Sequence, residues 1–182
     1  MAQSKKSEVT LDLNARLAKV KLFLCDVDGI LTDASVFIGL EKEIKRFHIR
    51  DGLGMMMLRK EGVLIGWVSN RPSTATTLRA EELKIDFLVQ AKGSKVQKVE
   101  ALLAETGFKW DEVCYMGDDV VDLGVLRRVG IAATVANAIP EAKANSHYVT
   151  RVEGGQGAVR EVVDLILKAQ NRWNRIVAEH SA

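Results

Sequence analysis

Two acidic clusters, each directly after an apolar run, are the residues of this chain best suited to chemistry. Asp26 and Asp28 follow the first run, and Asp118, Asp119 and Asp122 lie in the segment GDDVVD. An Asp-x-Asp triplet alone is common, and aspartates often cap helices, but GDDVVD is far less frequent by chance. Carboxylates gathered in one place repel one another unless a cation lies between them. Oxygen ligands favour a hard cation, so the clusters predict a Mg²⁺ site.

The same carboxylates could transfer a phosphoryl group. One of them, Asp26, can attack phosphorus and form an acyl phosphate, while Asp28 can protonate the leaving oxygen and then activate water. The transferred phosphoryl group carries negative charge, which hydrogen-bond donors and cations must stabilise. Ser69 and Lys95 supply a hydroxyl and an ammonium group. Each of these two alone could equally be a turn residue or an exposed helix end, so the prediction depends on their convergence with the aspartates.

Apolar runs precede these residues and predict the strands of a parallel sheet, because strands buried on both faces are continuously apolar. Five runs occur, at 20–25, 62–68, 85–89, 112–116 and 131–135. The segments between them at 73–83, 94–106 and 119–128 have helical periodicity. The alternation predicts an α/β fold with a Rossmann-like, doubly wound, mostly parallel sheet. Ligands of such sheets gather at the carboxyl ends of the strands.

Three more elements complete the expected architecture. A leading helix is expected at about 11–19, a small inserted β-hairpin at about 34–49, and a C-terminal helix at about 157–178. The hairpin follows from two short apolar segments, SVFIG and IKRFH, on either side of a polar turn. The length of 182 residues suits one domain, so 1–182 is expected to be a single domain without a cap.

The composition excludes several classes of protein. The net charge is +2 with 27% charged residues, which is too balanced for a nucleic-acid binder that relies on bulk electrostatics. No apolar run approaches the roughly 20 residues that a membrane span needs. The first ten residues are polar and lack the apolar core of a secretory signal. We therefore expect a cytoplasmic protein with neither nucleic acid nor membrane as a partner.

Four segments in this order, CDVDGILTD, WVSNR, GSK and GDDVVD, resemble the motifs of the haloacid-dehalogenase-superfamily phosphatases. FHIRDGLG, LRAEELKI, YVTR and GGQGAVRE are similar to segments of the small, capless branch of that superfamily. The resemblance covers residues 20–170. It implies a Rossmann-like core, Mg²⁺ as the cofactor, and a homotetramer in which the hairpin of one subunit helps close the active site of its neighbour.

The resemblance also implies a role for each motif residue. Asp26 matches the nucleophile and metal ligand, Asp28 the acid/base, whose main-chain carbonyl binds the metal, and Asp118 the remaining carboxylate ligand. Phosphate would be bound by Ser69, Asn70 and Lys95, with Asp119 and Asp122 in supporting positions.

The capless branch acts on sugar-acid phosphates, which makes such a small molecule the expected substrate. Arg71 and Arg79, together with Asp28, match positions where relatives bind the sugar acid. Relatives that act on nine-carbon sialic-type acids tend to have an acidic residue in place of Arg71. The chain is therefore expected to hydrolyse the phosphate of an eight-carbon 2-keto acid, and the free acid would be a lipopolysaccharide precursor. The phosphate of a nine-carbon sialic-type acid is the alternative.

A non-catalytic receiver domain is the other alternative, since it uses clustered aspartates, a Ser or Thr, a lysine and Mg²⁺. Receivers have their lysine after all the acidic groups. Here Lys95 precedes the second acidic cluster, and Asp28 supplies an acid/base that would shorten the life of an acyl phosphate. The order of the motifs therefore favours a phosphatase.

Overall fold

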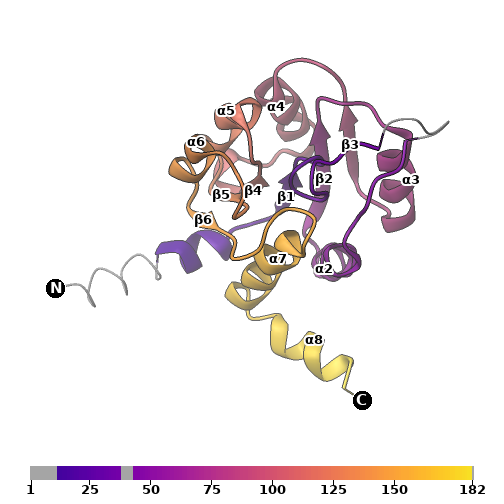
Figure 1. Ribbon diagram of the computed structural model, residues 1–182. Helices are drawn as coiled ribbons and strands as arrows, with labels where there is room; N and C mark the ends of the chain where they lie inside the picture. The colour runs from indigo at the N-terminus through magenta and orange to yellow at the C-terminus, as the bar shows by residue number, and fades with distance from the viewer. Residues whose placement is uncertain (1–11, 38–42, 182) are drawn as a thin grey trace.

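A parallel β-sheet forms the centre of the molecule. The computed structural model describes residues 12–37 and 43–181. The sheet has the strand order β3-β2-β1-β4-β5-β6, and all neighbouring strands are parallel (Figure 1). The strands are β1 (Leu22–Cys25), β2 (Leu64–Ser69), β3 (Phe87–Gln90), β4 (Val113–Met116), β5 (Ile131–Thr134) and β6 (Tyr148–Val149). This arrangement confirms the predicted doubly wound α/β fold. Only β6, two residues long, was too short to predict.

Helices cover both faces of the sheet (Figure 1). They are α2 (Ile49–Lys60), α3 (Thr74–Leu83), α4 (Lys95–Thr106), α5 (Leu123–Leu126), α6 (Pro140–Ala144), α7 (Ala158–Ala169) and α8 (Trp173–Glu179), with 3₁₀ turns η1 (Trp110–Glu112) and η2 (Val120–Asp122). Residues 12–17 are also helical. On one face α2 packs against α7 and α3, and on the other α4 packs against α5. None of the helices in the described ranges is long and apolar enough to cross a membrane.

The register of the central strands aligns their carboxyl ends. Cys25 in β1 pairs with Trp67 in β2 and with Met116 in β4. The chain therefore leaves all three strands at the same edge, which brings the residues that follow, Asp26 and Asp118, close together. Every residue of β1 and β4 is buried, as their continuous apolar runs predicted.

Two serine caps determine where α3 and α4 begin. The Ser73 Oγ accepts a hydrogen bond from the Thr76 N–H at 3.3 Å, and the Ser94 Oγ accepts one from the Gln97 N–H at 3.4 Å. Such caps satisfy backbone donors that a helix start leaves free. Because α4 begins at Lys95, its cap also fixes where that side chain leaves the sheet edge.

The terminal helices differ from the prediction in extent. The segment predicted as one helix over about 157–178 forms α7 and α8, separated at Asn171, whose φ is 58°. An α-helix cannot continue through a left-handed residue, and hydrophobic periodicity does not reveal a single residue of this kind. The leading helix predicted over about 11–19 ends at 17 and is followed by a turn, and residue 11 lies outside the described residues.

The hairpin predicted over about 34–49 is not formed as paired strands in the part that is described. Neither 34–37 nor 43–48 contains a strand, and 38–42 lie outside the described residues. A two-stranded hairpin on its own is at best marginally stable in water, so apolar alternation alone does not make these segments pair.

The segment 43–48 is instead attached to the body of the protein through its side chains. The Phe47 ring stacks on Trp67 with centroids 6.1 Å apart. Arg46 donates to Asp33 at 2.9 Å. The chain that returns from the insert is therefore held against the carboxyl end of β2.

Two motifs of the resemblance, FHIRDGLG and GGQGAVRE, meet where α2 packs on α7. The Asp51 Oδ1 accepts a hydrogen bond from the Arg160 N–H at 2.7 Å, so a carboxylate of α2 caps the first turn of α7. Asp51 is buried, and its Oδ2 has no hydrogen-bond partner among the described residues. A Cβ on Gly54 would lie 2.8 Å from the Arg160 side chain. These motifs hold the two helices together.

Burial of Asp51 makes stability depend on pH. Burial raises the pKa of Asp51 from 3.8 to about 6, against the opposing hydrogen bond from the Arg160 N–H. The folded state then binds this proton more tightly than the unfolded state, so ionisation costs stability as pH rises through about 6. Between pH 4 and 7, wild type should lose up to about 3 kcal/mol of unfolding free energy relative to Asp51→Asn. Urea denaturation at several pH values measures this, with the exposed Asp12→Asn as control. Parallel pH profiles of wild type and Asp51→Asn would contradict it.

Candidate active site

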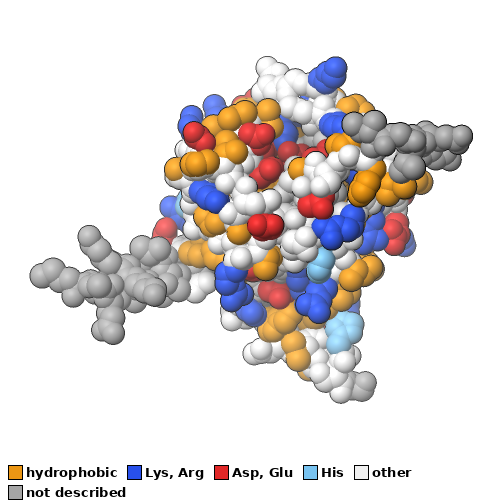
Figure 2. Space-filling view, in the orientation of Figure 1, with side chains coloured by type: hydrophobic (Ala, Val, Ile, Leu, Met, Phe, Trp, Pro, Cys, Tyr) orange, Lys and Arg blue, Asp and Glu red, His pale blue; other side chains and the backbone are white. Residues whose placement is uncertain are grey.

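Three carboxylates converge at the carboxyl edge of β1 and β4. Asp26, Asp118 and Asp122 each have an oxygen within 4.8 Å of the others. Asp26 follows β1, Asp118 follows β4, and Asp122 ends the 3₁₀ turn η2. Several acidic side chains lie close together in the upper part of the visible face, and others are scattered over the rest of it (Figure 2). The expected convergence of residues distant in sequence is therefore present.

A buried lysine binds two of these carboxylates. The Lys95 Nζ lies 2.5 Å from the Asp26 Oδ2 and 2.7 Å from the Asp122 Oδ1, and only 2% of Lys95 is exposed. Burial alone would lower the pKa of Lys95, but the charges of Asp122 and Asp26 outweigh it and raise this pKa. The ammonium group therefore stays charged between the two carboxylates.

Donors occupy both oxygens of Asp122. Besides Lys95, the Tyr115 hydroxyl donates to its Oδ1. The backbone N–H groups of Asp118 and Asp119 donate to its Oδ2 at 3.1 and 3.2 Å. With its lone pairs engaged, Asp122 orients Lys95 and the GDD loop, and Asp26 and Asp118 have the freer oxygens.

The close approach of Asp118 to the first motif requires Gly29. A Cβ at this position would lie 2.1 Å from the Asp118 Oδ2, and Gly29 has a φ of 90° that side chains rarely adopt. Only glycine tolerates both constraints. The glycine of the DVDG sequence therefore gives Asp118 the space to reach Asp26.

Crowding changes the proton affinity of the two freer carboxylates. Burial raises the pKa of Asp26 to about 6. The positive charge of Lys95 lowers this pKa, and the negative charge of Asp122 raises it. Burial raises the pKa of Asp118 to about 7, and the charges of Asp122 and Asp26 add to this effect. A second cation beside Lys95 would relieve the repulsion, and an all-oxygen donor set suits Mg²⁺. The residues present therefore fit this ion.

Ser69 is the last residue of β2, and Asn70 follows it at the same edge. The buried Ser69 Oγ accepts from the Arg71 N–H at 3.0 Å, which forms a tight turn after the strand. Asn70 accepts a hydrogen bond from Lys98, one turn after Lys95 on α4. The second and third motifs are thus linked by a lysine that the sequence did not single out.

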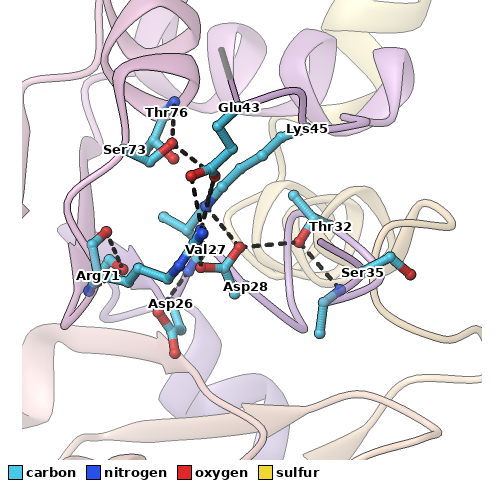
Figure 3. A network of polar contacts seen from close by, with 12 residues as sticks. Asp26, Val27, Asp28, Thr32, Ser35, Glu43, Lys45, Arg71, Ser73 and Thr76 are labelled. Carbon is cyan, nitrogen blue, oxygen red and sulfur yellow. Dashed lines mark hydrogen bonds and ion pairs between the residues drawn. The ribbon is translucent and has the colours of Figure 1, made fainter. Parts of the chain in front are cut away.

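Asp28 joins a network of ion pairs with side chains of the insert and of the turn after β2 (Figure 3). Its Oδ1 lies 2.7 Å from the Lys45 Nζ, and its Oδ2 lies 3.9 Å from an Arg71 nitrogen. The Arg71 guanidinium makes two hydrogen bonds to Glu43, at 2.7 and 2.9 Å. The insert segment 43–48 thus brings one acidic and one basic side chain to Asp28.

The remaining predicted residues lie elsewhere or have local roles. Arg79 donates to Glu82 at 2.6 Å and lies against Gly52 of α2, so the structure does not bring it into the network of Arg71. Its position about one and a half turns into α3, which begins at Thr74, explains the separation. The Asp119 Oδ1 accepts from the Val120 N–H at 2.7 Å and caps η2.

The sequence reasoning missed several residues of this site, namely Glu43, Lys45, Lys98 and Tyr115. Glu43 and Lys45 lie in the insert, where the alternation of polar and apolar residues was explained as a hairpin. Tyr115 lies inside an apolar strand. Only Lys98 carried a usable signal, because its spacing of three from Lys95 places both on one side of α4.

Comparison with known proteins gives a consistent assignment. A family model described as haloacid dehalogenase-like hydrolase matches residues 55–162. The chain is 38% identical to a 3-deoxy-D-manno-octulosonate 8-phosphate phosphatase of Yersinia pestis over 88% of this chain and 87% of that protein.

Two solved structures are similar in fold as well as sequence. A probable YrbI-family phosphatase from Pseudomonas syringae superposes with a TM-score of 0.92 at 38% identity, covering 94% of this chain and 98% of the other. A 3-deoxy-D-manno-octulosonate 8-phosphate phosphatase from Moraxella catarrhalis has a TM-score of 0.90 at 36% identity, covering 92% and 97%. That structure is a complex with a magnesium ion, a phosphate ion and a KDO molecule, the free sugar acid.

The fold and the carboxylate edge are those of a phosphohydrolase with a Rossmann-like core. The chain belongs to the haloacid dehalogenase-like hydrolases. Within that family its named relatives above are 3-deoxy-D-manno-octulosonate 8-phosphate phosphatases.

Binding of Mg²⁺ should be detectable without turnover. The ion would bind the folded carboxylate cluster and not the unfolded chain, so it should raise the melting temperature of wild type. At a Mg²⁺ concentration of 100 times Kd, the free energy of unfolding should increase by about 2.7 kcal/mol. Asp118→Asn should lose most of this response, whereas Asp111→Asn, an exposed residue at the other end of β4, should keep it. Differential scanning calorimetry with and without EDTA measures the shift. An equal shift in both variants would contradict this location of the metal.

Proposed function

We propose that the protein hydrolyses 3-deoxy-D-manno-octulosonate 8-phosphate to the free sugar acid and inorganic phosphate, with Mg²⁺ as the cofactor. The observation that carries this proposal is the placement of Asp26 and Asp118 beside the buried Lys95. A carboxylate nucleophile, a second anionic ligand and a fixed cation are what phosphoryl transfer requires. The substrate follows from the identity to the Yersinia pestis and Moraxella catarrhalis phosphatases.

The proposed reaction has two steps at Asp26. A carboxylate oxygen of Asp26 bonds to phosphorus as the bond to the sugar oxygen breaks, and Asp28 gives that oxygen a proton. Water then bonds to phosphorus and loses a proton to Asp28, and the bond to Asp26 breaks, which releases phosphate and regenerates the carboxylate. Lys95 and Ser69 hold the phosphoryl oxygens. Bound Mg²⁺, held by Asp26, Asp118 and the Asp28 main-chain carbonyl, would neutralise charge on the phosphoryl group.

The sugar end of the substrate would bind at Arg71. A 2-keto sugar acid carries a carboxylate, and the planar guanidinium matches a carboxylate with two charge-assisted hydrogen bonds. Arg71 lies two residues after Ser69, and its side chain is 43% exposed. A nine-carbon acid is the second candidate, but the basic side chain at this position favours the eight-carbon acid.

We also propose that the chain assembles as a homotetramer through its insert. Val36, Phe37 and Ile44 flank 38–42 in the sequence and are 52%, 55% and 53% exposed, so association through the insert would remove these apolar side chains from water. Association there would also shield an otherwise open site. Sedimentation equilibrium at micromolar concentration should report four subunits of 20.1 kDa. A fully active monomer would refute the assembly.

A panel of sugar phosphates tests the function. With Mg²⁺, wild type should release phosphate faster from 3-deoxy-D-manno-octulosonate 8-phosphate than from nine-carbon acid phosphates or neutral hexose phosphates. EDTA should abolish the activity and added Mg²⁺ restore it. Asp26→Asn, which removes the attacking oxygen, should be inactive with an unchanged circular dichroism spectrum, and Asp111→Asn is the matched control. Preference for a neutral sugar phosphate, or substantial turnover by Asp26→Asn, would contradict the proposal.

A further inference from the structure

Glu43 holds one edge of the Arg71 guanidinium. The Glu43 Oε1 accepts from the Arg71 Nη1 at 2.7 Å, and its Oε2 accepts from the Arg71 Nη2 at 2.9 Å. Figure 3 shows the two side chains pointing toward each other, with Asp28 beside them. A two-point contact of this kind fixes both the position and the plane of the guanidinium.

Other groups hold Glu43 itself in place. The Ser73 Oγ donates to its Oε1 at 3.1 Å, and the Lys45 Nζ lies 3.6 Å from the same oxygen. Ser73 is the N-cap of α3, and its N–H donates to the Gln90 side chain at 2.9 Å. Glu43 therefore connects the insert to the start of a helix, which favours a negative charge at that end.

Arg71 keeps donors for a second carboxylate. A guanidinium has five N–H donors, and Glu43 takes two of them. The Arg71 Nε has no hydrogen-bond partner among the described residues, and 43% of the side chain is exposed. The N–H of Nε and the remaining N–H of Nη2 therefore form the edge that can donate two hydrogen bonds to a ligand carboxylate.

We infer that Glu43 is a positioning residue that presents this free edge of Arg71 to the carboxylate of the sugar-acid substrate. The inference rests on the proposed function, since it concerns how that substrate is recognised. Glu43 does not act by competing for Arg71. Its displacement would leave the Ser73 hydroxyl without its acceptor and would remove one of the two carboxylates near the Lys45 ammonium, which is costly.

A double-mutant cycle with Arg71 tests whether Glu43 acts through it. Glu43→Gln should raise KM for the sugar-acid phosphate about tenfold, with kcat within about twofold, because the lost orientation affects binding and not the phosphoryl end. Turnover of p-nitrophenyl phosphate, which has no carboxylate, should not change. In an Arg71→Ala background, Glu43→Gln should have no further effect, since the group that it positions is gone.

The matched control is Glu112→Gln. Glu112 forms a similar ion pair with Lys21 at 2.6 Å, and its side chain is 20% exposed against 24% for Glu43, but it lies at the opposite end of the sheet. Glu112→Gln should leave both substrates unaffected. Calorimetric titration of the free sugar acid, which needs no turnover, should show the same roughly tenfold weakening for Glu43→Gln alone.

The outcomes separate this inference from the proposed function. If wild type hydrolyses p-nitrophenyl phosphate but not the sugar-acid phosphate, the proposed function is wrong and the inference falls with it. If wild type hydrolyses both, the inference alone is overturned by an unchanged or lower KM of Glu43→Gln, by equal losses on the two substrates, or by additive effects with Arg71→Ala.

Discussion

The ammonium group of Lys95 lies between Asp26 and Asp122, and the geometry of the active edge depends on it. Without this cation three carboxylates would crowd one corner of the sheet with nothing to offset their repulsion. The Ser94 cap fixes the start of α4, so the Lys95 ammonium group is held by the first turn of a helix. Asp122, in turn, uses its second oxygen to hold the GDD loop. One buried ion pair therefore aligns β1, β4 and α4.

In the proposed mechanism, the sheet builds the half of the site that binds phosphate, and the insert builds the half that binds the sugar. Asp26, Asp118 and Lys95 belong to strand ends and a helix start, whose positions the sheet register determines. Glu43 and Lys45 come from a segment without secondary structure, held to the body by the stacking of Phe47 on Trp67. With this division, the segment that would contact the sugar can change in sequence without disturbing a strand of the sheet.

The sequence predicted the half of the site that the sheet determines. Continuous apolar runs marked five strands, and parallel strands must end at a common edge, so the convergence of Asp26 with Asp118 could be expected. The ion-pair network of Asp28 could not be predicted, because it depends on how 43–48 folds back toward β2. Hydrophobic periodicity does not determine the course of such a segment. The paired hairpin and the single terminal helix failed for the same reason. The local sequence pattern does not reveal whether a short apolar segment will find a strand to pair with. It also does not reveal that Asn171 has a left-handed backbone conformation.

Rapid-quench mass spectrometry can detect the covalent phosphoryl-enzyme that we propose forms on Asp26. Wild type mixed with 3-deoxy-D-manno-octulosonate 8-phosphate and Mg²⁺ should, within the first turnover, carry one phosphoryl group on the peptide that contains both Asp26 and Asp28. Fragmentation should assign the group to Asp26, and hydroxylamine should remove it, as expected of an acyl phosphate. A phosphoryl group on Asp28 or Asp118, or phosphate release with no labelled protein at any quench time, would contradict the account.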